Sequence, residues 1–118
     1  MTGDVDEYAA GLDDAAVELL YLFRDRVLAL GDVDERVHPS EVAWARSRVF
    51  AAAFIVSSRL EVAIDLLRRV EHPRLRESFA TTKKVWTHRM FFTAADQIDD
   101  VIGELLAEAF DTVGPGTR

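Results

Sequence analysis

The chain has 118 residues, a formal net charge of −7 and no cysteine. Because 49% of its residues are hydrophobic, the composition excludes an intrinsically disordered chain and fits one domain with a buried core. The lack of cysteine excludes disulfides, thiolate chemistry and cysteine-bound zinc. The acidic N-terminus predicts no signal peptide, and no apolar run is long enough to span a bilayer. We therefore expect a cytoplasmic protein that does not contact a membrane.

The charge is unevenly distributed along the chain. Residues 1–37 contain three Lys/Arg and ten Asp/Glu, a net of −7. Residues 38–92 contain ten and five, a net of +5, and residues 93–118 contain one and six, a net of −5. Runs of like charge usually mark solvated surface, which is the interpretation we favour. The alternative is that the basic middle segment contacts an anion at short range, because the chain as a whole is acidic.

The N-terminal third predicts one helix. Residues 1–12 are acidic and small, and we expect a flexible N-terminus there. From about residue 13 to 30, apolar residues recur every three or four positions, as in a helix that docks on a sheet. Asp13 suits the N-cap of this helix and Gly31 suits its end. The connector that follows is expected to include a short edge strand near residues 36–38.

The longest apolar region, residues 41–67, predicts a three-stranded antiparallel meander. Residues 60–66 alternate apolar with polar or small side chains, as in a strand with one buried face. A turn over residues 57–59 would place Val56 opposite Leu60 and would pair the apolar residues of the two strands with each other. A register shifted by one residue would place Val56 opposite Arg59 and mix apolar with polar residues on each face. We therefore favour the register with Val56 opposite Leu60. The first of the three strands also fits a short helix.

This register predicts a meander with two unlike faces. The inner, core-forming face comprises Ala43, Ala45, Phe50, Ala52, Phe54, Val56, Leu60, Val62, Ile64 and Leu66. The outer face comprises Val42, Trp44, Arg46, Ala51, Ala53, Ile55, Glu61, Ala63 and Asp65. The outer face is neither a dry core nor an ordinary surface. It would be open to solvent, to a partner or to a ligand.

Two further elements complete the sheet layer. Residues 68–83 predict a polar, basic link with one short helical turn near residues 73–79. Residues 84–92 predict another strand, but both of its alternating sets of side chains are partly apolar. Neither the inward face of this strand nor its position in the sheet follows from the pattern.

A second helix is predicted to begin at Thr93, which resembles a capping box together with Asp96, and to end before Gly114. Residues 13–112 would then form a single domain and residues 113–118 a flexible tail. The order helix, four strands, helix predicts an α+β two-layer sandwich. Both helices would pack on one face of an antiparallel sheet of four to five strands.

The sequence resembles a family of small bacterial domains, domain of unknown function 5655, over about residues 8–112. The segments that carry the resemblance are ALGDVDERVHPSEVAWARSRVFAAAF, SSRLEVAIDLL, HPRL, KVWTHRMFF and IDDVIGELLAEAF. Its most recognisable points are Gly31, Ser40, Phe50-Ala51 and Thr87-His88. The resemblance implies an organisation but no mechanism. Some members of the family sit beside other domains in longer proteins, which implies an accessory module.

The leading functional hypothesis is a non-enzymatic accessory or protein-interaction module. An exposed apolar patch usually marks an interface, so the outer face could support a homodimer or bind another protein. The candidate interface or ligand residues on this face are Val42, Trp44, Arg46, Glu61 and Asp65. Glu61 and Asp65 are spaced too widely to be paired catalytic carboxylates. We favour the interpretation that they lie on a solvated face and form ion pairs with Arg46 or Arg89.

Two alternatives remain open. Nucleic acid or another anion could bind the basic middle segment, with Trp44 or Trp86 available for stacking. The basic residues concerned are Arg46, Arg48, Arg59, Arg68, Arg69, Lys83, Lys84 and Arg89. A small-molecule or enzymatic site near His88 and Arg89 is the second alternative, although a structural, hydrogen-bonded His88 is favoured. The three histidines share no metal-ligand spacing, so we expect neither a metal nor a cofactor.

Overall fold

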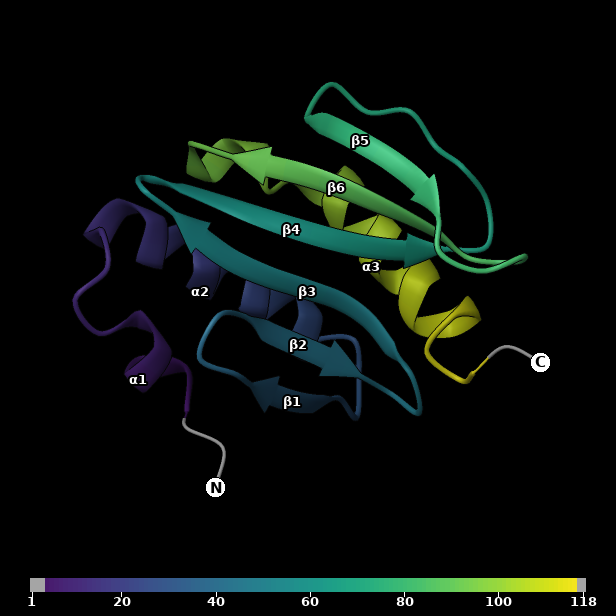
Figure 1. The fold of residues 1–118 in the computed structure, drawn as a ribbon, viewed down its shortest axis with the longest axis horizontal. Helices are drawn as coiled ribbons and strands as arrows, with labels where there is room; N and C mark the ends of the chain where they lie inside the picture. Colours follow the sequence, from purple (N-terminus) through teal and green to yellow (C-terminus); the bar gives the residue numbers. More distant parts are fainter. Residues whose placement is uncertain (1–3, 117–118) are drawn as a thin grey trace.

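The structure is a computed structural model that describes residues 4–116. One six-stranded antiparallel sheet, in the order β1-β2-β3-β4-β6-β5, lies in front of two long helices in the view of Figure 1. The strands are β1 (Asp34–Val37), β2 (Val42–Ala45), β3 (Val49–Val56), β4 (Arg59–Leu66), β5 (Leu75–Ala80) and β6 (Trp86–Phe92). The helices are α1 (Val5–Ala9), α2 (Asp14–Leu28) and α3 (Asp100–Thr112), with a 3₁₀ turn, η1, at Ala95–Gln97.

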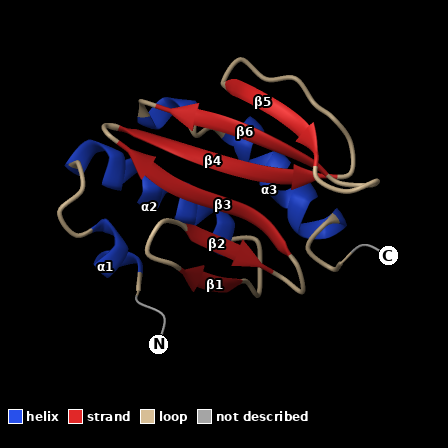
Figure 2. Cartoon of the chain, in the orientation of Figure 1, coloured by secondary structure: helices blue, strands red, loops and turns tan. Residues whose placement is uncertain are grey.

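The predicted α+β architecture is confirmed, with α2 and α3 packed on the same face of the sheet (Figure 2). The sheet has six strands instead of the expected four to five. The helix predicted over residues 13–30 is present as α2, and the Asp13 side chain accepts a hydrogen bond from the Ala16 N–H at its start. No helix within residues 4–116 is long and apolar enough to cross a membrane.

The β3–β4 hairpin has a register different from the one predicted. Val56 pairs with Arg59, so the turn contains only Ser57 and Ser58. Ser57 has a φ of 54°, and a positive φ at this position is a feature of the two-residue turns that match the twist of antiparallel strands. The predicted register was wrong by one residue. Strand β3 is apolar at every position, so its pattern does not distinguish its two faces.

The shift by one residue turns β3 and β2 over relative to β4. Trp44 and Val42, predicted to face outward, are fully buried under the helices. Phe54, predicted to face inward, lies on the other side, because it pairs with Glu61. The residues of β3 that face the helices are Ala51, Ala53 and Ile55. The opposite face carries Ala52 and Val56 of β3 and Ala43 of β2. The alternation predicted for β4 is correct, with Leu60, Val62, Ile64 and Leu66 in the core.

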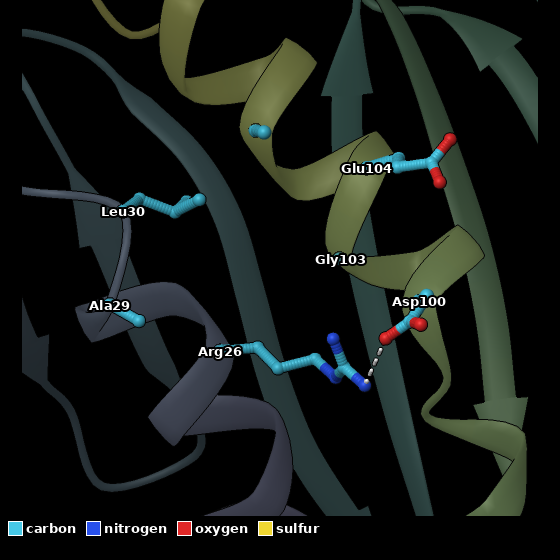
Figure 3. A pocket seen from close by; sticks show the side chains of 7 residues that line it. Arg26, Ala29, Leu30, Asp100, Gly103 and Glu104 are labelled. Atoms are coloured by element: carbon cyan, nitrogen blue, oxygen red, sulfur yellow. Dashed lines mark hydrogen bonds and ion pairs between the residues drawn. The ribbon is translucent and has the colours of Figure 1, made fainter.

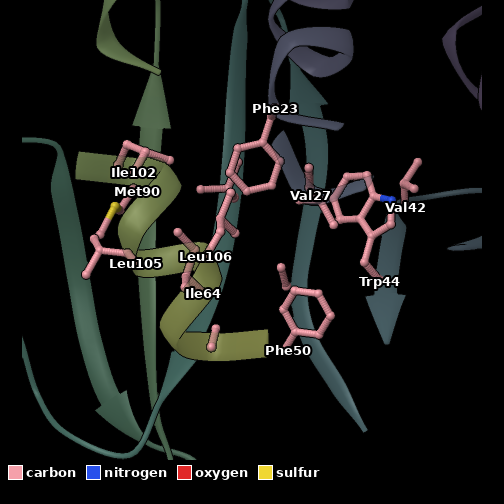
Figure 4. Packing of buried hydrophobic residues seen from close by; sticks show 14 of the residues in the cluster. Phe23, Val27, Val42, Trp44, Phe50, Ile64, Met90, Ile102, Leu105 and Leu106 are labelled. Carbon is pink, nitrogen blue, oxygen red and sulfur yellow. The ribbon is translucent and has the colours of Figure 1, made fainter. Parts of the chain in front are cut away.

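The core lies between the sheet and the two long helices (Figure 4). Phe23 of α2 packs between two rings from the sheet, 5.6 Å from Trp44 and 6.3 Å from Phe92 between ring centroids. Phe50 remains buried because a bulge between β2 and β3 turns it toward Phe110 of α3, where the two rings meet edge to face. Each fully buried side chain of this kind stabilises the fold by about 1.5–3 kcal/mol.

Two elements differ from the prediction at the sheet edge and at α3. The link expected over residues 68–83 contains strand β5, which pairs with β6, and no helical turn. Its sequence shows no alternation because it is an edge strand with most side chains exposed. The second helix begins after Asp99, whose side chain accepts from the Ile102 N–H. Residues 95–97, within the stretch expected to start the helix, form η1 instead.

Both ends of the described part of the chain contact the sheet layer. Within residues 1–12, α1 is helical and buries Val5 and Ala9, and the Tyr8 hydroxyl accepts a hydrogen bond from the Ile55 N–H at 2.8 Å. At the other end, the Gly114 carbonyl accepts from the N–H groups of residues 47 and 48. Residues 1–3 and 117–118 lie outside the described residues.

Candidate anion-binding site on the open face

The open face is the side of the sheet opposite α2 and α3, and it faces the reader in Figure 1. Paired residues on neighbouring strands share a face of a sheet. Phe54 of β3, Glu61 of β4 and Phe91 of β6 therefore form one row across the open face. Asp65, Thr87 and Phe79 form a parallel row farther along the strands.

Glu61 is the most buried acidic side chain on the open face, with only 2% of its surface exposed. Three guanidinium groups surround its carboxylate. Nη1 of Arg76 lies 3.0 and 2.9 Å from its two oxygens, and Nη2 of Arg59 lies 2.9 Å from Oε2. Nη2 of Arg89 lies 3.6 Å from Oε1. A carboxylate can be buried only with such partners, so Glu61 holds the three cations together.

Two of the arginines on the open face also stack on phenylalanine rings. The guanidinium carbon of Arg74 lies 4.2 Å from the ring centroid of Phe91, and its Nε donates to the Phe91 carbonyl at 3.0 Å. The guanidinium of Arg89 lies 5.7 Å from the ring of Phe54 and pairs with Glu77 at 3.3 Å. We call Arg59, Arg74, Arg76 and Arg89 the arginine cluster.

The arginine cluster carries more positive charge than its acidic partners neutralise. Four guanidinium groups face two carboxylates, those of Glu61 and Glu77, which leaves a formal excess of two positive charges. The side chains of Arg59 and Arg76 are 37% and 53% exposed, although each is bonded to Glu61. They line a hollow of about 250 Å³ together with Phe91. Each guanidinium has five N–H donors, so one bonded to a carboxylate retains donors for a second anion.

Asp65 lies on the same face but has a different environment. Its Oδ1 accepts a hydrogen bond from the Thr87 hydroxyl at 2.7 Å, and that hydroxyl is also bonded to the hydroxyl of Thr81. Burial raises the pKa of Asp65 above its ordinary value, and the Thr87 hydrogen bond and the charge of Arg48 only partly oppose this. Asp65 is therefore easier to protonate than an ordinary aspartate.

His88 is a structural residue, as the sequence favoured. It is fully buried on the helix-facing side of β6. Its Nε2 accepts a hydrogen bond from the Val70 N–H at 3.0 Å, and its Nδ1 lies 3.2 Å from the Ile64 carbonyl. These two bonds define a neutral ring with its proton on Nδ1. Both ring nitrogens are thus occupied by the backbone.

The five residues predicted as an interface do not form one surface. Val42 and Trp44 are in the core, and the Trp44 Nε1–H donates to Glu35 at 2.9 Å. Arg46 lies beside α3, 4.6 Å from the ring of Phe110. Only Glu61 and Asp65 lie on the open face, so the hypothesis of a homodimer through a Trp44 surface has no structural basis.

The predicted basic set is also divided by the fold. Arg59 and Arg89 belong to the arginine cluster, whereas Arg68 makes two hydrogen bonds of 2.9 Å to Glu108 of α3. Trp86, proposed for stacking, faces the helix side and has Arg69 against its ring. Sequence reasoning missed Arg74 and Arg76, because the strand that carries Arg76 was not predicted. Their signal was the closely spaced cations within residues 74–77.

The chain matches the model of a protein family over residues 5–113, and that family is described as a domain of unknown function (DUF5655). The chain belongs to the DUF5655 family. No curated protein and no solved structure matches it. The resemblance in the sequence motifs is thereby confirmed, and the bacterial origin that it implied stays a prediction. Membership of DUF5655 implies no activity, so a function must be argued from the structure.

Two other hollows in this DUF5655 domain lie on the helix side. One of about 460 Å³ lies between α2 and α3, and Figure 3 shows Arg26 reaching across it to Asp100. Another of about 480 Å³ separates α3 from the segment after β4, near Arg68 and Glu108. In each hollow one arginine already pairs with a carboxylate, Arg26 with Asp100 and Arg68 with Glu108. Across residues 4–116, no three His, Asp or Glu side chains form a group that could hold a metal ion.

Proposed function

We propose that this DUF5655 domain is a non-enzymatic binding module that takes an anionic ligand on the open face, at the arginine cluster. The observation that carries the proposal is the convergence of Arg59, Arg76 and Arg89 on the single buried carboxylate of Glu61. Surface ion pairs usually join one cation to one anion. Here the excess charge is held in place before any ligand arrives, which reduces the entropy lost on binding.

The position of the histidine supports binding over catalysis. General acid–base catalysis requires a titratable group within hydrogen-bond reach of the reacting atoms. His88 lies on the opposite side of the sheet with both nitrogens bonded to the backbone. On the open face, Asp65 is bonded to a threonine hydroxyl, and Glu61 is enclosed by guanidinium groups.

Titration with tripolyphosphate tests the proposal. We expect the wild-type domain to bind this anion in calorimetry at low salt, and we expect the affinity to fall as salt is added. Arg76→Gln removes one charge from the cluster and leaves two guanidinium groups on Glu61. A charge-assisted hydrogen bond contributes about 1.5–3 kcal/mol, so this variant should bind at least about tenfold more weakly.

Arg68→Gln is the matched control, because it makes the same charge change on the helix side, where Arg68 pairs with Glu108. It should leave tripolyphosphate binding nearly unchanged. Thermal unfolding of both variants checks that they are folded. The proposal fails if the wild-type domain does not bind, or if both variants weaken binding equally, since net charge alone would then be responsible.

A further inference from the structure

We infer that the anionic ligand is a single-stranded nucleic acid, with bases on the phenylalanine rings of the open face and phosphates on the arginine cluster. This inference rests on the proposed function and adds the class of ligand. Its first basis is the set of rings: Phe54 on β3, Phe91 on β6 and Phe79 on β5 all lie on the open face. Phe79 is 43% exposed, and the other two are partly exposed.

The spacing of two of these rings suits successive bases. Phe54 and Phe91 stand on either side of Glu61 in one row, two strand positions apart. Neighbouring strands are about 4.8 Å apart, so the two positions are roughly 10 Å apart. An aromatic side chain on a sheet offers a base a stacking surface, and such stacking tolerates any sequence because every base has a π-face.

The arginines lie against the rings and do not form a separate patch. Arg89 contacts Phe54, and Arg74 contacts Phe91. A guanidinium group can bind a phosphate with two parallel hydrogen bonds and can also stack on a base. Beside them, Ala52 pairs with Ala63 across the strands, and these small side chains leave room for an extended chain to lie on the sheet.

The charge of the rest of the domain favours a single strand over a duplex. Residues 93–116 contain six Asp/Glu and no Lys/Arg, and together with α2 they form the layer behind the sheet. A duplex hides its bases from the rings, and a surface that wraps it would bring these acids near phosphates. An acidic peptide would use the arginine cluster but would leave the three rings without a role.

Fluorescence anisotropy with short labelled oligothymidine and oligouridine strands tests the inference, with a duplex of equal length and unlabelled tripolyphosphate as competitors. We expect the single strands to bind at least about tenfold more tightly than the duplex or tripolyphosphate, since each stacked base adds affinity. Phe54→Leu and Phe91→Leu should each weaken oligonucleotide binding roughly tenfold and leave tripolyphosphate binding unchanged. Leu22→Ala, which truncates an exposed apolar side chain on α2, is the control and should change neither.

The outcomes separate the ligand class from the proposed function. If tripolyphosphate binds and the phenylalanine variants bind oligonucleotide like wild type, the nucleic-acid inference is wrong and the proposed function stands. A phosphorylated acidic peptide that binds more tightly than the single strands would also overturn it. If neither tripolyphosphate nor oligonucleotide binds, both fail. Phe79→Leu serves as a further variant if Phe54→Leu or Phe91→Leu unfolds the domain, because Phe79 is exposed on an edge strand.

Discussion

Glu61 and Asp65 lie four residues apart on the same face of β4, yet their surroundings differ. Glu61 is enclosed by three guanidinium groups, which offset the cost of burying its charge. Asp65 receives its hydrogen bond from the neutral hydroxyl of Thr87. The nearby charge of Arg48 does not fully offset the cost of burying the Asp65 carboxylate. At the residue scale, the partners of each carboxylate determine whether the cost of burying its charge is offset.

Asp65→Asn should stabilise the domain at neutral pH. The pKa of Asp65 is raised in the folded state, so its contribution to stability is present below the ordinary value of 3.8 and is lost as the pH rises through the raised pKa. Asparagine can still accept from Thr87 and carries no charge. We expect a gain on the order of 1 kcal/mol in urea unfolding at neutral pH, and almost none in acid. A variant less stable than wild type at neutral pH would contradict this.

At the scale of the element, Gly103 shows how α2 and α3 pack together. A Cβ at this position would lie 2.7 Å from Nη1 of Arg26. The guanidinium of Arg26 occupies the space beside the glycine and donates to the Ile98 carbonyl and to Asp100, each at 3.2 Å. The glycine, unfavourable within a helix, therefore lets an arginine of α2 reach the side of α3 (Figure 3).

Gly103→Ala has two opposing effects on stability. Removing the glycine from the helix should add about 1 kcal/mol, and moving Arg26 aside should remove much of this gain. In an Arg26→Ala background, the substitution should yield the full gain of about 1 kcal/mol. A double-mutant cycle in urea measures the difference between the two backgrounds. Equal effects in both would mean that Arg26 does not limit this position.

At the scale of the whole molecule, two arginine–glutamate ion pairs join the helix layer to the sheet layer. Arg24 of α2 bonds Glu35 of β1 at 2.6 and 3.1 Å, and Glu108 of α3 bonds Arg68 after β4. Burial raises the pKa of Glu35, but hydrogen bonds from Arg24 and Trp44 lower it by more, so it lies below its ordinary value. The Arg68 hydrogen bond lowers the pKa of Glu108, with burial opposing it.

Acid should therefore weaken the attachment of the helices to the sheet. A lowered pKa contributes stability that is present above the ordinary value of 4.5 and is lost as the pH falls through the folded-state pKa. Glu35→Gln should cost about 1–3 kcal/mol at neutral pH and should flatten the loss of melting temperature in acid. Glu18→Gln, on the exposed side of α2, is the control. A Glu35→Gln variant with the acid profile of wild type would contradict the assignment.

The sequence by itself determined the features that depend on neighbouring residues. The helix over residues 13–30 and the alternation within β4 were both predictable, because apolar spacing reports which face of one element is buried. The uneven charge, acidic at both ends and basic in the middle, was also readable. A structural, hydrogen-bonded His88 was the favoured interpretation, because the sequence placed no nucleophile or carboxylate within its reach.

Only the tertiary structure decided which face of β3 joins the core, because an all-apolar strand fits either register and the two-residue turn at Ser57 selects one. That choice buried Trp44 and moved Phe54 to the open face. Arg76 reaches Glu61, 15 residues away in the chain, because β5 pairs with β6 at the edge of the sheet. Local patterns record burial along one element, whereas a site built across β3, β4, β5 and β6 depends on which strands lie side by side.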